Sequence, residues 1–228
     1  MLEGHLFQIY SKLPVFLQNV ICSLAGVKMR FERYNSTFRQ ARHFLAKSEW
    51  WSEEEFRAYQ DENTRQIVRH AYATVPYYHD VMDNLGIGPQ DINSTSDLAQ
   101  LPLLDKQTLR REGDRMYSVA VPPSTRRHGQ TGGTTGTSLK LAYDETTSPW
   151  QWAIWWRHRS RFGIRLNDSF IVFAGRDVIP LDSMEPPIWR RNIPMRQTYV
   201  SIHHLLKQNL PPLADYLCRR SVAYYSGY

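Results

Sequence analysis

The stretch "QTGGTTGTSLKL", residues 130–141, places three glycines and four threonines in a short segment between two β-like runs. Glycine lets main-chain N–H groups approach an anion closely, and hydroxyl groups donate further hydrogen bonds to phosphate oxygens. We therefore predict that this segment is a phosphate-binding loop at the tip of a hairpin. A hairpin tip that binds nothing is the alternative that these residues alone leave open.

Two well-known phosphate loops are excluded by the spacing. In the Walker pattern a lysine and a hydroxyl residue follow the last glycine, whereas Gly136 is followed by Thr137 and Ser138. The glycines also fail to give the G-x-G-x-x-G pattern of dinucleotide-binding folds. Lys140 either assists as a point charge two residues beyond the turn or is an exposed strand lysine.

The segments around the loop indicate an α/β fold. Residues 1–115 read as a mostly helical N-terminal region, in which Ser52 and Glu55 form a capping-box pattern at one helix start and Pro76 ends that helix. Residues 116–228 alternate strand and helix, which is typical of layered α/β domains. The expected elements are β-like runs flanking the loop, an aromatic helix over 148–164, a strand over 167–175, Pro-rich loops over 180–194, a helix over 201–220 and a strand over 221–228.

Composition narrows the class of protein. The chain has 228 residues, 42% of them hydrophobic, and a net charge of +6 that is carried mostly by arginine, so it is globular and suited to an anionic partner. No apolar run is long enough to span a membrane, because the best candidate, residues 13–27, contains Pro14, Gln18 and Asn19. We expect an amphipathic or buried helix there. Cys22 and Cys218 form no metal-like spacing, which favours a cytoplasmic protein without a metal site.

Several aromatic and basic residues have two readings. Trp150, Trp152, Trp155 and Trp156 either line an aromatic pocket or pack under a sheet, and packing is the expectation because large aromatic side chains dominate cores. Arg157, Arg159, Arg161 and Arg165 either contact phosphates or form a solvated helix face, which is the default. His203 and His204 are adjacent, so on a helix they diverge and make a poor metal pair; we expect surface or boundary positions.

The loop and its context resemble a known family. "TGGTTGTS" (131–138) is similar to the phosphate loop of adenylate-forming enzymes, in the phenylacetate–CoA ligase branch, and departs from it at Gly132 and Ser138. "VRHAYATVPYYHDVM" (68–82) and "LGIGPQDINSTSDLAQLPLLDKQTLR" (85–110) resemble the helical lead-in of that branch. "YNSTFRQARHFL" (34–45) and "SEWWSEEE" (48–55) resemble its capsular-polysaccharide, CapK-like members. The resemblance covers most of residues 30–228.

The resemblance implies an ATP-dependent acid–thiol ligase acting in capsule or surface polysaccharide biosynthesis. A carboxylate is activated as an acyl-adenylate with the help of Mg²⁺ and is passed to coenzyme A or another carrier thiol. The implied phosphate cradle is Thr131, Gly132, Gly133, Thr134, Thr135 and Gly136, and Tyr225, Ser226, Gly227 and Tyr228 border the substrate pocket. No catalytic residue is indicated. The implied partners are a small carboxylate and a nucleotide, with peripheral membrane contact and oligomeric state left open.

Later motifs of that family are missing from the sequence. There is no Y-G-x-[ST]-E segment, no T-G-D aspartate and no C-terminal lid domain with its lysine. We therefore expect an N-terminal portion of a longer enzyme: a helical lead-in followed by an incomplete part of the large sheet-and-helix domain, inactive alone. The other classes left open are a non-catalytic nucleic-acid or membrane-surface binder, suggested by the basic charge, and a degenerate scaffold relative.

Overall fold

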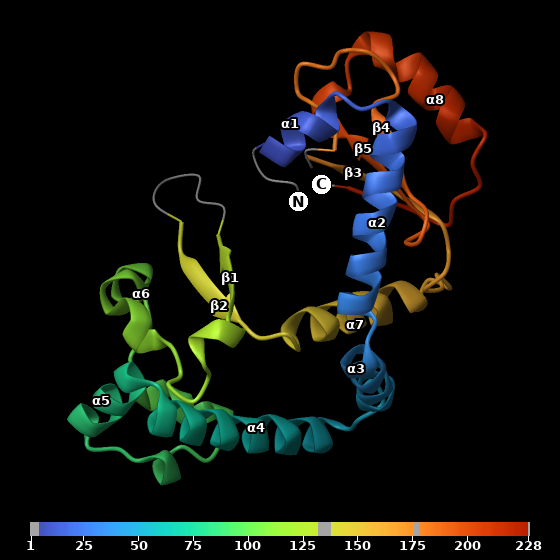
Figure 1. Ribbon diagram of the computed structural model, residues 1–228. Coiled ribbons are helices and arrows are strands. Elements are labelled where there is room, and N and C mark those ends of the chain that lie inside the picture. The colour runs from blue at the N-terminus through green and yellow to red at the C-terminus, as the bar shows by residue number, and fades with distance from the viewer. Residues whose placement is uncertain (1–4, 132–137, 176–177, 228) are drawn as a thin grey trace. The chain divides into compact units, whose positions relative to one another are not determined.

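The computed structural model describes residues 5–131, 138–175 and 178–227 (Figure 1). Helices and strands both contribute, which confirms the α/β class, and helices precede the first strand as expected. The chain forms two compact units, Met1–Arg42 with Ser148–Tyr228 and His43–Thr147. The division between residues 1–115 and 116–228 that the sequence suggests is a division into the domains of a complete enzyme. It stays a prediction.

The first unit is built around a four-stranded sheet in the order β4-β5-β3-β6. Its strands are β3 (Phe170–Ala174), β4 (Trp189–Asn192), β5 (Gln197–Ser201) and β6 (Tyr224–Ser226). β3 lies parallel to both β5 and β6, whereas β4 lies antiparallel to β5. The carboxyl ends of β3, β5 and β6 therefore meet at one edge of the sheet.

Helices cover both faces of this sheet. Side chains alternate between faces along a strand, so Ile171 and Phe170 of β3 point in opposite directions. Ile171 belongs to a buried cluster with Ile179, Ile188, Val200 and Leu213, the last from α8 (Leu210–Cys218). On the other face Phe170 stacks on Tyr224, with ring centroids 4.8 Å apart, and Arg159 of α7 (Thr147–Ser160) lies over both rings.

α2 (Val15–Arg33) closes the open edge of β4 (Figure 1). An edge strand presents unpaired main-chain N–H groups. Here the Asn19 Oδ1 accepts from the Arg191 N–H at 2.7 Å, and the Ser23 Oγ accepts from the Ile193 N–H at 3.2 Å. The polar residues that disqualify residues 13–27 as a membrane span therefore pair with the sheet. None of the described helices is both long and apolar enough to cross a bilayer.

A buried arginine fixes the same contact from inside. Arg190 is only 3% exposed, and its Nε donates to the Gln18 Oε1 of α2 at 2.5 Å. Its Nη1 donates to the main-chain oxygens of Pro187 and Trp189, each at 2.7 Å. Burial lowers the pKa of the Arg190 guanidinium from its usual range. Neutral oxygens satisfy this cation, since no ion pair to it is found among the described residues.

The second unit packs α4 (Glu53–Thr74) against α5 (Pro76–Leu85). The capping box of Ser52 and Glu55 is confirmed, and Pro76 occupies the first turn of α5 rather than extending α4. The core between them contains Val68, Met82 and Ile92. The other α-helices among the described residues, apart from α7 and α8, are α1 (His5–Ser11), α3 (Ser36–Ser48) and α6 (Lys106–Glu112).

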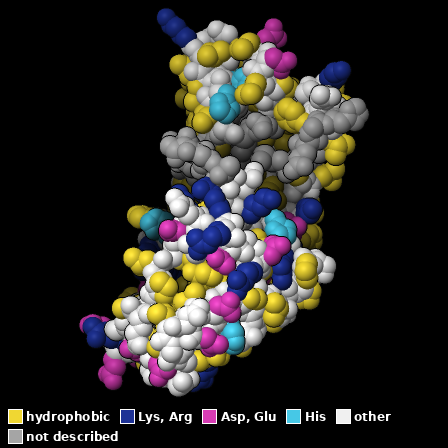
Figure 2. Space-filling model, turned by 90° about the vertical axis from the view of Figure 1, so that its left-hand side faces the viewer, with side chains coloured by type: hydrophobic (Ala, Val, Ile, Leu, Met, Phe, Trp, Pro, Cys, Tyr) yellow, Lys and Arg dark blue, Asp and Glu magenta, His cyan; other side chains and the backbone are white. Residues whose placement is uncertain are grey.

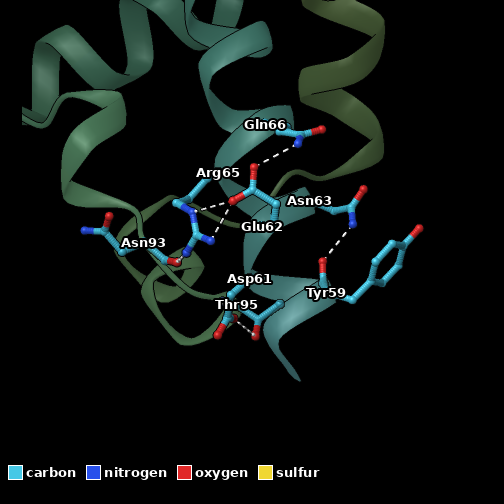
Figure 3. Close-up of polar contacts among 8 residues, drawn as sticks. All are labelled: Tyr59, Asp61, Glu62, Asn63, Arg65, Gln66, Asn93 and Thr95. Atoms are coloured by element: carbon cyan, nitrogen blue, oxygen red, sulfur yellow. Dashed lines mark hydrogen bonds and ion pairs between the residues drawn. The ribbon is translucent and has the colours of Figure 1, made fainter. Parts of the chain in front are cut away.

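Polar contacts attach α4 to the loop that follows α5 (Figure 3). The Asp61 Oδ1 accepts from both the main-chain N–H and the hydroxyl of Thr95, at 3.0 and 3.2 Å. Arg65 donates to the Asn93 carbonyl at 2.8 Å and pairs with Glu62 at 2.7 Å. These contacts hold the irregular segment after α5 in addition to the apolar contacts of Ile92.

Two expectations about the second half of the chain are wrong. β4 lies within residues 180–194, which were expected to be loop. β5 follows at Gln197–Ser201, where no strand was expected. The helix expected from residue 201 begins only at Leu210, after two 3-10 turns, Ile202–His204 and Lys207–Asn209. Pro211 and Pro212 explain the delay, because proline is favoured in a first helical turn and disfavoured inside a helix.

Arg159 lies in an aromatic cage instead of on a solvated helix face. Its Cζ lies 4.9–6.0 Å from the ring centroids of Trp155, Trp156, Phe170 and Tyr224. Within the described part of the chain, neither the Arg159 Nη1 nor the Tyr224 Oη has a hydrogen-bond partner, although both atoms are buried. The expectation of a solvated face is therefore wrong for Arg159.

Replacing Tyr224 by phenylalanine is expected to raise the free energy of unfolding by about 1 kcal/mol, because it removes a buried, unpaired hydroxyl. Burial raises the pKa of Tyr224 to about 12. An unfolded tyrosine ionises near pH 10, so the stability that the neutral phenol contributes is complete below about pH 10 and is lost as pH rises toward 12. Urea unfolding should show that the difference in the free energy of unfolding between Tyr224→Phe and the wild type grows from neutral to alkaline pH. A Tyr224→Phe variant that is less stable than the wild type by the same amount at every pH would contradict this prediction.

Candidate functional site

A two-stranded hairpin brings together the two ends of the glycine-threonine segment. β1 (Arg127–Gln130) pairs antiparallel with β2 (Lys140–Tyr143), with Gln130 opposite Lys140 and Gly129 opposite Leu141. The strands expected on both sides of the segment are thus confirmed. A Cβ added to Gly129 would lie 3.2 Å from the ring of Tyr143, so that exposed ring would have to shift by a few tenths of an ångström.

Thr131 and Leu139 close the base of this loop. The Thr131 main-chain N–H donates to the Leu139 carbonyl at 3.0 Å, and the Thr131 Oγ1 accepts from the Leu139 N–H at 3.1 Å. Thr131 is exposed, and its hydroxyl proton stays available to a ligand. The other cradle residues of the prediction, Gly132, Gly133, Thr134, Thr135 and Gly136, lie outside the described residues.

The approach to the hairpin is fixed by one arginine. Arg126 donates to the Ser118 carbonyl at 2.9 Å and to the Val121 carbonyl at 2.7 Å. The Ser118 hydroxyl in turn donates to the Thr74 Oγ1 at 2.9 Å, near the end of α4. The base of the loop is therefore tied to the helical part of its own unit.

Polar residues at the end of β2 complete the surroundings of the hairpin. Lys140 is exposed on the strand, and its role toward a ligand stays untested. The Asp144 carboxylate accepts from the hydroxyls of Thr146 and Thr147, at 2.8 and 3.0 Å, and from their main-chain N–H groups. These hydrogen bonds, led by the Thr146 hydroxyl, lower the pKa of Asp144. Asp144 therefore caps the turn into α7.

The second candidate region is the carboxyl edge of the parallel strands, where ligands bind in many open α/β sheets. Tyr225 of β6 is 56% exposed there, and its ring centroid lies 6.3 Å from that of Phe173. A Cβ added to Gly227 would lie 3.3 Å from the Phe173 Cβ, a tight contact that requires a shift of a few tenths of an ångström. Ser226 pairs with Val172 inside the sheet, and Tyr228 lies outside the described residues.

Sequence reasoning missed a buried serine–histidine contact at this edge. His204 is 1% exposed, and its Nε2 lies 2.9 Å from the Pro180 carbonyl oxygen. Because a carbonyl only accepts, Nε2 carries the proton, and Nδ1 accepts from the Ser201 hydroxyl at 2.7 Å. The expectation of a surface or boundary position is wrong for His204 and holds for the exposed His203. Only the exposure pattern of the folded chain separates these neighbours.

The tryptophans divide between packing and exposure. Trp156 is 2% exposed and donates to the Tyr34 hydroxyl at 3.2 Å, as a core residue. The Arg33 Cζ lies 4.1 Å from the Trp152 ring centroid. Trp155 is 50% exposed. The packing expectation is therefore confirmed for Trp156 and is wrong for Trp155.

Charge on one face of the molecule bears on the nucleic-acid alternative. Figure 2 shows Lys and Arg side chains interspersed with Asp and Glu on that face. Arg115 pairs with Asp80 and Glu112, and Arg57 pairs with Glu53. An uninterrupted basic stripe would be the footprint of a nucleic acid. The face in Figure 2 gives that alternative no support.

Comparison with known proteins points to one family. No protein-family model matches the chain. The phenylacetate–coenzyme A ligase of Aromatoleum evansii is 38% identical over 93 residues, 40% of this chain and 21% of that protein. The same enzyme of Escherichia coli K12 is 32% identical over 95 residues, 41% of this chain and 22% of that protein. Protein CapK of Staphylococcus aureus is 21% identical over 205 residues, 89% of this chain and 43% of CapK.

Among solved structures, a 2-hydroxyisobutyryl-CoA ligase in complex with 2-HIB-AMP and CoA is 19% identical, with a TM-score of 0.48. The match covers 76% of this chain and 37% of that one. The chain spans less than half the length of the curated relatives it matches. Over the part it spans, the resemblance seen in the sequence is confirmed: the chain is similar to phenylacetate–coenzyme A ligases and to protein CapK.

Proposed function

We propose that this chain carries the nucleotide phosphate-binding part of an ATP-dependent carboxylate–thiol ligase. In that reaction a carboxylate oxygen bonds to the α-phosphorus of ATP and pyrophosphate leaves. A thiol, from coenzyme A or another carrier, then takes the acyl group and AMP leaves. The observation that carries the proposal is the hairpin that closes the glycine-threonine segment at Thr131 and Leu139.

The described residues around the segment fit a polyphosphate. β1 and β2 hold its two ends side by side, and the Thr131 main-chain N–H is used within the hairpin, so Thr131 would contact phosphate through its hydroxyl. The main-chain N–H groups of a cradle would come from residues 132–136. Mg²⁺, when bound with ATP, would neutralise charge on the phosphates; the chain would bind and orient them.

The acyl substrate would lie at the carboxyl edge of the sheet. Tyr225 offers an exposed aromatic ring there. Gly227 lies close against Phe173, so a side chain at position 227 would be crowded. We propose Tyr225, Ser226, Gly227 and Tyr228 as its border. We propose surface polysaccharide biosynthesis, in the cytoplasm, as the setting. The similarity to protein CapK over 89% of this chain agrees with the CapK-like resemblance of residues 34–45 and 48–55.

We expect the 228-residue chain to bind ATP with Mg²⁺, and Thr131→Val to weaken that binding about tenfold, the effect of losing one hydrogen bond to a charged group. Gly133→Val and Gly136→Val should weaken it further, because added side chains keep main-chain N–H groups from the phosphates. Isothermal titration calorimetry measures the affinities.

Adenosine serves as the ligand control, since it lacks phosphate and should not respond to these substitutions. Far-UV circular dichroism shows whether each variant keeps its secondary structure. ATP binding that is unchanged in folded Gly133→Val and Gly136→Val chains would contradict the hairpin assignment.

A further inference from the structure

A second group of cationic side chains lies at the opposite end of the sheet, where β3 and β5 begin. Arg191, Arg196 and Arg220 line a pocket of about 380 Å³ there. The volume falls within the range of small-molecule sites. This pocket lies entirely in the first unit, and it shares no residue with the hairpin or with the carboxyl edge of the sheet.

The lining of this amino-edge pocket is suited to an anion. Hydroxyl groups come from Ser169, Thr198 and Ser221, and no carboxylate contributes to it among the described residues. Among the residues that the structure describes, none of the three arginines makes an ion pair. Three like charges around one hollow repel one another, and a bound anion relieves that repulsion. Their guanidinium groups can bind phosphate oxygens in pairs, which lysine cannot do.

Two of the three arginines, Arg196 and Arg220, make a side-chain contact that leaves donors free. Arg196 gives one hydrogen bond, from Nη1 to the Asn167 carbonyl at 2.7 Å, out of five possible donors. The Arg220 Cζ lies 5.0 Å from the Tyr216 ring centroid, and Tyr216 also stacks on Trp189 at 4.3 Å. The Tyr216 hydroxyl lies 3.1 Å from the Thr198 Oγ1 of the pocket.

The backbone at Arg196 adds a separate observation. Its φ is +50°, in the left-handed region that glycine or asparagine adopts most readily. Arg196 ends the turn between β4 and β5, where its N–H donates to the Ile193 carbonyl at 2.9 Å. A long cationic side chain therefore stands at a turn position where a small residue would cost less, facing the pocket and a neighbouring hollow of about 460 Å³ that Arg30 also lines.

We propose that the amino-edge pocket binds the phosphoryl or pyrophosphoryl group of a small molecule, with Arg191, Arg196 and Arg220 as the anion-binding residues. The site is distinct from the glycine-threonine hairpin and does not depend on the function proposed for that hairpin. Thr198 and Ser221 supply hydroxyl donors beside the arginines.

The test is calorimetric titration of the 228-residue chain with inorganic pyrophosphate, without magnesium and at constant ionic strength. Arg191→Gln and Arg220→Gln should each weaken binding about tenfold, as expected for loss of a charged hydrogen-bond donor. Without pyrophosphate, neither substitution should lower the melting temperature, because each relieves repulsion between like charges.

Arg219→Gln is the matched control, since it removes the same charge next to Arg220 from an exposed side chain paired with Asp215 at 2.8 Å. Its affinity should equal that of the wild type. Gly133→Val separates this site from the hairpin, because pyrophosphate binding at the arginines should survive that substitution. Glycerol phosphate and phosphatidate vesicles, compared in the same assay, show whether a soluble compound or a lipid supplies the phosphoryl group.

Binding that is equally weakened by Arg219→Gln would overturn the proposal, because it would reflect net charge alone. So would binding lost in Gly133→Val and retained in Arg191→Gln, or no saturable binding at millimolar pyrophosphate. If the hairpin proves not to bind ATP, the pyrophosphate experiment still tests this pocket, because it depends on the arginine variants.

Discussion

Replacing Arg190 by alanine is expected to lower the free energy of unfolding of the sheet-containing unit by about 3–5 kcal/mol, because hydrogen bonds from a charged donor contribute about 1.5–3 kcal/mol each and those of one side chain are not fully additive. Three acceptors lose their donor at once: the Gln18 side chain and the carbonyls of Pro187 and Trp189. Arg190 is 3% exposed, so water cannot easily replace it.

The location of the contact enlarges this effect. Gln18 belongs to α2 and Arg190 to β4, so the substitution loosens the helix that pairs with the open strand edge through Asn19 and Ser23. Tyr10 of α1 is buried nearby and hydrogen-bonded to the Val178 carbonyl at 2.8 Å, and burial raises its pKa. We expect the loss to spread to these contacts.

Urea unfolding followed by tryptophan fluorescence measures the change. Arg191→Ala is the matched control, because Arg191 is the next residue on the same strand and its side chain is exposed. Its effect should stay within about 0.5 kcal/mol, as for other exposed positions. Similar stabilities of Arg190→Ala and Arg191→Ala would show that neutral oxygens around Arg190 contribute little.

His204→Ala is expected to cost about 2–4 kcal/mol, from two lost hydrogen bonds and the cavity left by a fully buried ring. The ring joins the Ser201 hydroxyl at the end of β5 to the Pro180 carbonyl, 24 residues earlier in the chain. The Asn209 side chain also donates to the His204 carbonyl at 3.0 Å. This residue therefore connects the loop after β3, the end of β5 and the start of α8.

His203→Ala controls for the loss of an imidazole at the adjacent, exposed position and should change stability little. Ser201→Ala should cost less than His204→Ala, because it removes one hydrogen bond and leaves the Pro180 contact. A double-mutant cycle of Ser201 and His204 should give a coupling of about 1 kcal/mol. Additive effects would contradict a direct Ser201–His204 hydrogen bond.

Local signals in the sequence were sufficient for elements whose start and end are written in neighbouring residues. The capping box at Ser52 and Glu55, the proline at 76 and the strands around the glycine-threonine segment depend on contacts a few residues apart. The position of the proposed phosphate loop depends on the same short range, because the Thr131–Leu139 pair closes the segment locally.

The segments that the sequence misplaced depend on distant partners. β4 reads as a proline-rich loop until it is paired with β5 on one side and with α2, about 170 residues earlier, on the other. Arg159 lies against the aromatic rings of β3 and β6, and His204 is hydrogen-bonded to the Pro180 carbonyl. Neither partner can be inferred from spacing within one element.

The sequence by itself determined the α/β class, the helical lead-in, the two strands that flank the glycine-threonine segment, and the similarity to phenylacetate–coenzyme A ligases, because each depends on local pattern or direct similarity. The tertiary structure alone decided which polar residues are buried and which remain open to a ligand. Arg190 and His204 became internal supports, while Arg191 and Arg220 face a pocket, since burial depends on which strands and helices meet.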